Sequence, residues 1–340
     1  MKAAIMQGFA NNSKFILKEV DRPTCGKNEV LVEIYNASVN PLDWRMHKAF
    51  SYLPVNAILP LILGRDFSGV IVEKGSRVQD FEIGDEVYGY TMNFLKGSYA
   101  EYAAVSVNQL ARKPKNISFA EAAAIPLVGI TALRALQNAN LNAGARVLII
   151  GASGGVGTMA VQIARSLGAS VIGVCSGKNK ALVESLGAEQ VVDYTQQNYV
   201  DVLNGIDLVF DTTGKESLSK CQSIMNKDGN FITTLPGPMT ALNLVESTLG
   251  LKQQKVKIVS AFSNRKSLET LTQMVENQQL KPVIDSEFSF EQINDSMERS
   301  KTNHARGKVI LTIREQVQTK KAEQSAASKT QQVKDSPISA

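Results

Sequence analysis

The chain has little cysteine and little histidine. Its 340 residues include three cysteines, Cys25, Cys175 and Cys221, which lie far apart and form no Cys-x-x-Cys pair, and only two histidines. This pattern excludes a disulfide framework and a four-cysteine zinc site, and free thiols of this kind suit a reducing compartment.

Long apolar runs are also lacking. The longest such stretch lies near 57–63, whereas a membrane-spanning helix needs about 20 apolar residues. The start of the chain, 1–7, has none of the apolar core of a secretory signal peptide. We therefore expect no membrane span and a cytoplasmic location.

Neither sign of charge strongly dominates. Lys and Arg number 37 against 32 Asp and Glu, a formal net charge of +5, and some of the lysines lie in the polar segment 315–340. So mild an excess gives little support to a nucleic-acid partner, and an anionic cofactor explains it equally well. Segment 315–340 is polar and poor in aromatic residues, so we predict a disordered tail, with a weak interaction tail as the alternative.

What is present is the composition of an ordinary globular protein, 44% hydrophobic and 20% charged. Because 340 residues exceed what one hydrophobic core usually holds, two domains are expected. Within 1–124, β-branched runs such as 30–34 and 69–73 are bounded by turn residues and do not alternate with helices. This part is predicted to be largely antiparallel, as a partly closed barrel.

From about residue 125 the pattern changes to short apolar runs separated by helical stretches. The expected strands are at 146–150, 170–174, 190–192, 206–210, 230–234 and 256–260, and the expected helices are at 155–167, 180–186 and 216–225. Six strands with intervening helices predict an α/β fold with a doubly wound parallel sheet. Beyond about residue 261, helices are expected at 267–276 and 290–300, and a final strand at 307–313.

A glycine-rich turn follows the first strand of this sheet and opens a helix. It comprises Gly151, Ala152, Ser153, Gly154, Gly155, Val156 and Gly157. A diphosphate needs backbone N–H groups pointing at it and no Cβ in the way, and a helix N-terminus adds positive partial charge. The spacing is Gly-x-x-Gly-x-x-Gly, and a merely flexible turn is the alternative. The flanking strand and helix favour binding of a dinucleotide.

The end of the second strand indicates which dinucleotide. An acidic residue there selects NAD, and a basic one accommodates the 2′-phosphate of NADP. The chain offers Ser176, Lys178 and Lys180 and no acid before Glu184. The alternative is that the lysines only decorate a helix start, a placement that the helix dipole disfavours. We therefore predict NADPH as the cofactor.

Further motifs run through most of the chain. They are Met1-Lys2-Ala3, Asn40-Pro41-Leu42-Asp43-Trp44-Arg45, Gly64-Arg65-Asp66-Phe67-Ser68-Gly69, Gly84-Asp85-Glu86-Val87-Tyr88-Gly89, Gly97-Ser98-Tyr99-Ala100-Glu101-Tyr102, Ala123-Ala124-Ile125-Pro126, Gly129-Ile130-Thr131-Ala132 and Gly307-Lys308-Val309-Ile310-Leu311. With them the sequence resembles the zinc-independent, quinone-oxidoreductase-like (zeta-crystallin-like) branch of the medium-chain dehydrogenase/reductase superfamily. The resemblance implies a GroES-like catalytic domain in 1–124, a Rossmann NADP-binding domain in 125–261, a return to the catalytic domain in 262–314, and a homodimer.

The resemblance also implies site residues. Asn40 resembles the polar residue that faces nicotinamide and substrate, although a turn former before Pro41 is the alternative. Lys180 and Tyr194 resemble the residues that flank the adenosine phosphate, although Tyr194 could also be a half-buried loop aromatic. The residues at the domain crossover and after the fourth strand, where the cofactor passes, are Thr131, Thr212 and Gly214.

No catalytic zinc is expected. Zinc-dependent members of the superfamily have a cysteine near the present Asn40 and a Gly-His-Glu where this chain has Gly64-Arg65-Asp66. Arginine is always protonated and cannot ligate zinc. The two histidines, His47 and His304, lie in polar surroundings in the sequence, and catalytic zinc needs three protein ligands.

Without zinc, alcohol oxidation loses its Lewis acid, whereas reduction of an already electrophilic acceptor stays feasible. We therefore expect an NADPH-dependent oxidoreductase that transfers hydride to a quinone or an α,β-unsaturated carbonyl. The proton comes from water or from Tyr52, which resembles a tyrosine near this point in related enoyl reductases; the alternative is that Tyr52 is a core or surface aromatic. Arg65 could steady an oxyanion, or form a salt bridge with Asp66 or Asp43. The alternatives are an enoyl or alkenal reductase and a low-turnover NADPH-binding interaction protein.

Overall fold

The computed structural model describes residues 1–6, 14–50, 61–93, 96–235, 238–250 and 253–315, without the side chains of 46–50, 238 and 239. The expected proton donor Tyr52 and the expected tail at 316–340 lie outside these residues. Among the helices that are described, none has the length and apolar character needed to cross a membrane.

The first part of the chain forms two sheets. Its strands are β1 Lys2–Met6, β2 Phe15–Glu19, β3 Glu29–Val39, β4 Leu61–Ile62, β5 Asp66–Lys74, β6 Glu86–Tyr90, β7 Tyr102–Ser106 and β8 Leu110–Arg112. The larger sheet has the order β15-β16-β3-β5-β6-β8, with β7 also paired to β3, and the smaller one the order β2-β1-β4. Every pairing among these strands is antiparallel except that of β15 (Ile284–Ser289) with β16 (Lys308–Thr312). The prediction of a largely antiparallel first part is confirmed.

The second part is a six-stranded, wholly parallel sheet of order β11-β10-β9-β12-β13-β14. The strands are β9 Arg146–Ile150, β10 Ser170–Cys175, β11 Gln190–Asp193, β12 Ile206–Asp211, β13 Met225–Thr233 and β14 Lys255–Ile258. This is the strand order of doubly wound dinucleotide-binding domains. The predicted doubly wound sheet and α/β fold are confirmed.

Helices cover both faces of this sheet, which explains the buried apolar run at 147–150 in β9. Val147 and Ile149 of β9 pack in a core with α3 (Pro126–Ala139), α4 (Gly155–Ser166) and α5 (Lys180–Ser185). The alternate residues Leu148 and Ile150 pack on the other face. The elements on that face are α6 Tyr199–Val202 and α7 Leu218–Cys221, and α8 Pro238–Thr248 lies against α7 and β14. A strand buried on both faces cannot alternate with polar residues.

One element differs from the sequence expectation. The helix predicted at 216–225 is the single turn α7 followed by a 3-10 turn at Gln222–Ile224. The reason lies in the sheet, because Met225 already pairs with Ile206 of β12. The chain must therefore leave the helical path before residue 225.

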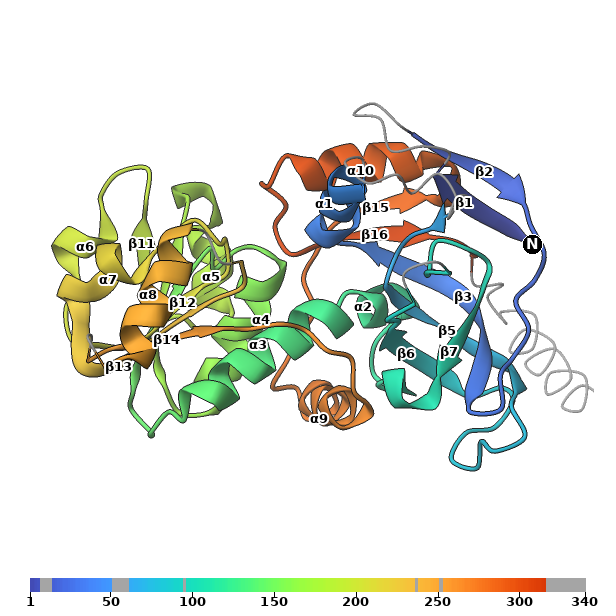
Figure 1. Ribbon diagram of the computed structural model, residues 1–340, viewed down its shortest axis with the longest axis horizontal. Helices are drawn as coiled ribbons and strands as arrows, with labels where there is room; N and C mark the ends of the chain where they lie inside the picture. Colours follow the sequence, from blue (N-terminus) through green and yellow to red (C-terminus); the bar gives the residue numbers. More distant parts are fainter. Residues whose placement is uncertain (7–13, 51–60, 94–95, 236–237, 251–252, 316–340) are drawn as a thin grey trace, which may run out of the picture.

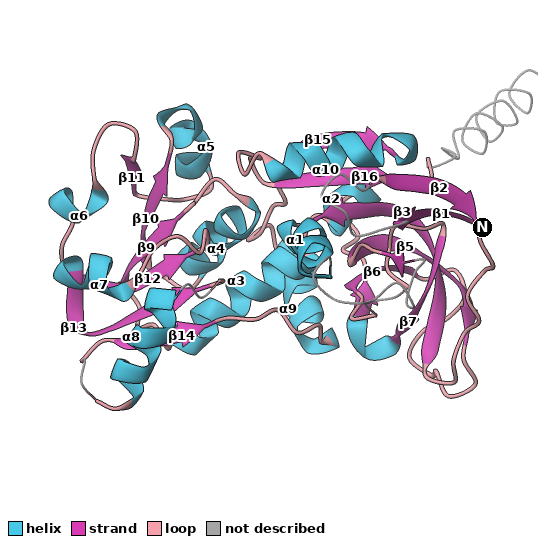
Figure 2. Ribbon diagram, turned by 45° about the horizontal axis from the view of Figure 1, so that its top comes forward, coloured by secondary structure: helices cyan, strands magenta, loops and turns pink. Residues whose placement is uncertain are grey.

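Three segments join the two parts (Figures 1 and 2). Helix α3 runs from one part toward the other, and α9 (Arg265–Glu276) lies beside it. The chain then returns through β15, α10 (Ile293–Lys301) and β16 to the first part, where β16 pairs with β3. The remaining helices of the first part are α1 Pro41–Phe50 and α2 Phe119–Ala123. The residue boundaries of the domains stay a prediction.

Candidate functional site

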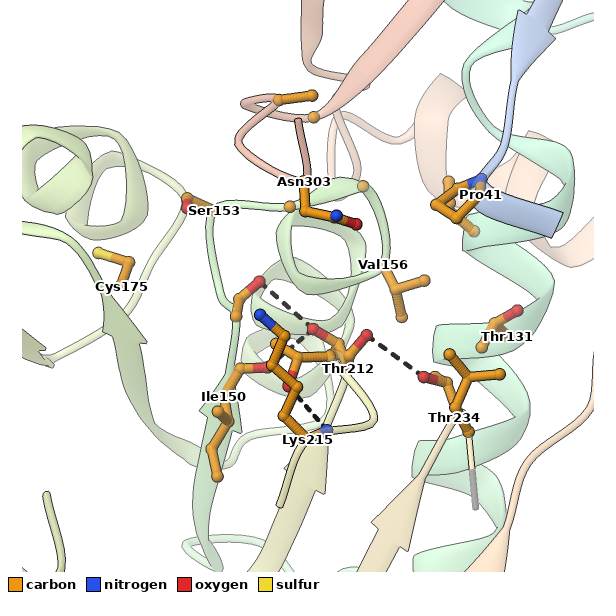
Figure 3. Close-up of a pocket in the computed structure, with 18 of the residues that line it drawn as sticks. Pro41, Thr131, Ile150, Ser153, Val156, Cys175, Thr212, Lys215, Thr234 and Asn303 are labelled. Atoms are coloured by element: carbon orange, nitrogen blue, oxygen red, sulfur yellow. Dashed lines mark hydrogen bonds between the residues drawn. The ribbon is translucent and has the colours of Figure 1, made fainter. Parts of the chain in front are cut away.

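A pocket of about 890 Å³ lies at the carboxyl ends of β9 and β12, between the parallel sheet and the first part of the chain. Beyond β9 the strand order reverses, since β10 lies on one side of it and β12 on the other. Open parallel sheets bind ligands at such a switch point. Figure 3 shows Pro41 and Thr131 on one side of this pocket, and Ser153 and Cys175 on the other.

The glycine turn forms one wall of the pocket. Gly151 has a φ of +79°, which favours glycine, and a Cβ on Gly157 would lie 2.2 Å from the carbonyl oxygen of Gly151. Gly154 precedes α4 in an extended conformation, and within the described chain no side chain caps this helix. No side chain therefore competes for the N–H groups in the first turn of α4, which suits an anionic ligand at this helix end. The turn residues that line the pocket are Gly151, Ser153, Gly154, Gly155 and Val156, whereas Ala152 and Gly157 lie behind them.

Ser176 and Tyr194, both predicted to bind the cofactor, line the pocket at the ends of β10 and β11. Lys178 and Lys180 do not: both are exposed, and Lys180 Nζ lies 3.7 Å from Glu184. Their predicted contact with a phosphate is therefore not part of the described pocket wall. Lysines that line the pocket include Lys215, which follows β12 (Figure 3), and Lys220 of α7.

Asn179, which follows β10, also lines the pocket, and the sequence did not predict it as a site residue. Its side chain is 94% buried, and its Nδ2 donates to Ser153 Oγ at 3.0 Å and to Ser176 Oγ at 3.2 Å. Its Oδ1 has no partner among the described residues. Because hydroxyls both donate and accept, the amide can turn and offer either its oxygen or its NH₂ to a ligand.

The predicted crossover and fourth-strand residues also gather here. Thr131 on α3 lines the pocket and donates from its hydroxyl to the carbonyl of Leu127 at 2.7 Å. Thr212 lines it after β12 and donates to the carbonyl of Ile150 at 2.7 Å (Figure 3). Gly214 does not line the pocket. Its φ of +71° turns the loop that places Thr212.

At the opposite end of the pocket, Asn40 meets a buried ion pair that the sequence reasoning did not find. Lys308 Nζ donates to Asn40 Oδ1 at 2.5 Å and lies 3.3 Å from Asp66 Oδ2. Asn40 Nδ2 donates to the same carboxylate oxygen at 2.9 Å. All three side chains are buried, and Asn40 and Lys308 line the pocket. The only sequence signal was a lysine at the start of the apolar strand Lys308–Thr312.

Arg65 lies outside the pocket wall. Its buried guanidinium lies 5.7 Å from the ring centre of Tyr90 and donates to the carbonyl of Thr91 at 3.5 Å. Tyr90 is the residue that lines the pocket, and burial raises its pKa to about 12, so its hydroxyl is neutral. Of the two acids expected beside Arg65, Asp66 also pairs with Lys308, and at Asp43 the charge of Arg65 acts against the larger effect of burial and lowers the pKa. The oxyanion role of Arg65 stays a prediction.

Asp43 is a second buried acid near this end. Burial raises its pKa to about 6, against the hydrogen bond from Tyr99 Oη at 2.7 Å, which lowers it. Its Oδ2 also accepts from the backbone N–H of Asn40 at 2.9 Å. Asp43 therefore fixes the backbone of Asn40 while Lys308 and Asp66 fix its side chain.

His304 lines the rim of the pocket, whereas the side chain of His47 lies outside the described residues. In the described ranges, no group of three or more His, Cys, Asp and Glu side chains is placed to hold a metal ion.

Comparison with known proteins agrees with this geometry. Residues 26–115 match the family model "Alcohol dehydrogenase GroES-like domain", and residues 186–311 match "Zinc-binding dehydrogenase". The chain is 34% identical to the chloroplastic NADPH-dependent alkenal/one oxidoreductase of Arabidopsis thaliana, over 85% of this chain and 73% of that protein. It is 31% identical to the chloroplast envelope quinone oxidoreductase homolog of the same plant, over 86% and 92%. The solved structure of the quinone oxidoreductase from Coxiella burnetii superposes with a TM-score of 0.81 at 30% identity, over 92% of this chain and 99% of that one.

Proposed function

The chain belongs to the quinone-oxidoreductase branch of the medium-chain dehydrogenase/reductase superfamily, and from this membership we propose that it reduces a quinone or an α,β-unsaturated carbonyl with NADPH. It is an oxidoreductase that uses a nicotinamide cofactor. When bound, the cofactor supplies the hydride. The observation that carries the proposal is the uncapped glycine turn at the switch point of the parallel sheet, facing a pocket that ends at Asn40.

The residues of the turn fit a diphosphate. No side chain could occupy the space at Gly157, and the first turn of α4 offers N–H groups to an anion. Thr131 and Thr212 line the pocket, and each hydroxyl is fixed by a hydrogen bond to a backbone carbonyl. Asn40 and Tyr90 present polar groups at the far end, where we place the acceptor.

We further propose NADPH rather than NADH. Support comes from Ser176, Asn179 and Lys215 on the pocket wall, and from the lack of an acid directly after β10. The name of the Arabidopsis alkenal/one oxidoreductase includes NADPH. Lys180, next to Asn179 in the sequence, is exposed and does not line the pocket, so its proposed contact with the 2′-phosphate rests on the family resemblance.

Titration of Lys180→Ala and Lys215→Ala with both nucleotides tests this choice. Each variant is expected to weaken NADPH binding by about fivefold and to leave NADH binding nearly unchanged, since an exposed charge contact contributes about 1 kcal/mol. Lys227→Ala, which removes an exposed lysine outside the pocket, is the matched control. Equal losses for the two nucleotides would count against recognition of the 2′-phosphate.

Steady-state oxidation of NADPH with a panel of quinones and enones tests the activity. Turnover with 9,10-phenanthrenequinone above that with a 2-enal supports a quinone reductase, and the reverse supports an alkenal reductase. Silence across the panel with NADPH binding intact would overturn the proposed reduction and leave a binding protein.

We also propose a homodimer in the cytoplasm. Exposed apolar side chains lie on α8, at Leu242 and Val245, and directly after it, at Leu249; α8 contacts the edge strand β14. Light scattering should give twice the chain mass of 36.9 kDa, and the chain mass itself would contradict the dimer. The cysteines are free thiols, as a reducing compartment allows, and a fluorescent fusion would reveal chloroplast or other targeting.

A further inference from the structure

Lys308 has a full set of hydrogen-bond partners at the floor of the pocket. Its Nζ lies 2.5 Å from Asn40 Oδ1, 3.1 Å from the carbonyl of Val39 and 3.3 Å from Asp66 Oδ2. The residue is only 4% exposed. Three N–H donors thus face three acceptors, one of which is a carboxylate. A buried ammonium with this partner set is held in one place.

The ammonium determines which way the amide of Asn40 faces. An ammonium has no lone pair, so only the oxygen of the amide can point at it. The NH₂ group of Asn40 then turns to Asp66 Oδ2 at 2.9 Å and to the carbonyl of Ser38 at 3.4 Å. Both N–H groups are used within the protein. The amide atom that keeps a free lone pair is Oδ1, because a carbonyl oxygen has two.

The same lysine stands next to the glycine turn. Its neighbour Gly307 donates from its N–H to the carbonyl of Ser153 at 3.0 Å, and Gly307 forms a parallel bridge with Gly154. Asp66, the partner of Lys308, accepts from the N–H of Leu127 in the first turn of α3 at 2.9 Å. The start of β16 therefore contacts the proposed diphosphate site and Asn40, and it is linked to the crossover helix through Asp66.

We propose that Lys308 is a positioning residue for hydride transfer, which holds the amide of Asn40 with its oxygen available to the bound nucleotide. The inference rests on the proposed function. In this arrangement Asn40 Oδ1 accepts a hydrogen bond from the nicotinamide nucleoside. The donor is either a ribose hydroxyl or the NH₂ group of the carboxamide. It does not donate to the carbonyl oxygen of the acceptor, because its N–H groups are already bound. Lys308 acts through Asn40 and carries no proton in the reaction.

The test compares Lys308→Met with the double variant Asp66→Asn/Lys308→Met. The single variant leaves the carboxylate of Asp66 buried without its counter-ion and is expected to melt at a lower temperature. The double variant removes both charges and should recover most of the melting temperature. If Lys308 positions Asn40, kcat stays about tenfold or more below that of the parent in both variants, while the Kd for NADPH changes less than about threefold.

Lys113 provides a matched control. It is 8% exposed, and its Nζ has three acceptors: the carbonyls of Pro114 and Ile117 at 3.1 and 2.7 Å and Glu86 Oε2 at 3.1 Å. It does not line the pocket. Lys113→Met should lower the melting temperature and leave kcat unchanged. A double variant at 66 and 308 with parental kcat would overturn the inference, because Lys308 would then be structural only.

A second readout does not depend on turnover. The side-chain NH₂ of Asn40, assigned in ¹⁵N-asparagine-labelled protein by its loss in Asn40→Asp, should be protected from solvent exchange. In Lys308→Met its exchange should accelerate by about tenfold or more, because the amide can turn. Unchanged protection would overturn the inference. If the parent fails to oxidise NADPH with any acceptor but Lys308→Met still releases the amide, the proposed function fails and the role of Lys308 in holding Asn40 stands.

Discussion

At the scale of single residues, Asp43 gives the site a pH-dependent stability. Burial raises the pKa of this carboxyl from 3.8 to about 6, so the folded protein holds the proton more tightly than the unfolded chain does. Between these two values the folded state binds more protons, and the free energy of unfolding therefore falls as the pH rises. Below the lower value both states are protonated, and the full contribution is present.

Asp43→Asn isolates this contribution. The amide can still accept from Tyr99 Oη and from the N–H of Asn40 through one oxygen, as Asp43 Oδ2 does. We expect the parent to lose about 3 kcal/mol of unfolding free energy relative to the variant between about pH 3 and pH 7. Urea unfolding at four pH values measures the difference. A constant difference across this range would contradict the raised pKa.

At the scale of elements, helix α4 is tied to the segment that leads back to the first part. Gln162, on the face of α4 away from solvent, donates to the carbonyl of Lys281 at 3.0 Å and accepts from its N–H at 2.8 Å. This pair of bonds fixes the returning chain beside the helix that begins at the glycine turn. One buried side chain, that of Gln162, therefore fixes helix α4 and the returning segment relative to each other.

Gln162→Leu removes both bonds while keeping the side chain about the same size. The backbone groups of Lys281 lose their partner, and because Lys281 is exposed and both hydrogen bonds are only partly buried, water can replace part of the loss, so we expect about 1–2 kcal/mol. Gln273→Leu on the exposed side of α9 is the control, with an expected change within about 0.5 kcal/mol. Denaturant unfolding of both variants measures the loss, and equal stability of the two would show that the contact contributes nothing.

At the scale of the whole molecule, the two parts share one core. Tyr88 and Ala111 of the antiparallel part belong to the same buried cluster as α3, α4 and α9. Tyr88 Oη donates to the carbonyl of Leu268 in α9 at 2.7 Å. A shared core couples the unfolding of the two parts, although their sheets are separate.

Calorimetry should therefore show one cooperative transition, and NADPH should shift all of it. A nucleotide at about 100 times its Kd adds about 2.7 kcal/mol to the stability of the folded state. NADH at the same concentration serves as the comparison and is expected to shift the transition less. Two transitions, of which only one responds to NADPH, would mean that the parts unfold independently.

The sequence by itself determined the parallel sheet and the glycine turn. Strands buried on both faces must be apolar where they are covered, and β9 carries that signal in the four consecutive residues 147–150. The sequence signal for the glycine turn was equally local, since the close approach at Gly157 and the positive φ at Gly151 both require glycine. The helix expected at 216–225 failed because pairing with β12 draws Met225 into the sheet, which is a non-local effect.

Only the tertiary structure decided which polar groups meet in the pocket. Ser176, Lys178 and Lys180 are close in sequence, but only Ser176 lies on the pocket wall, because the first residues after β10 turn the lysines to solvent. Lys308 is 268 residues from Asn40 and 242 from Asp66, and neither the acid nor the lysine alone predicts their ion pair. A charge is buried only where a distant partner compensates it, so pairing strand β16 with β3 is what sets the chemistry at the floor of the pocket.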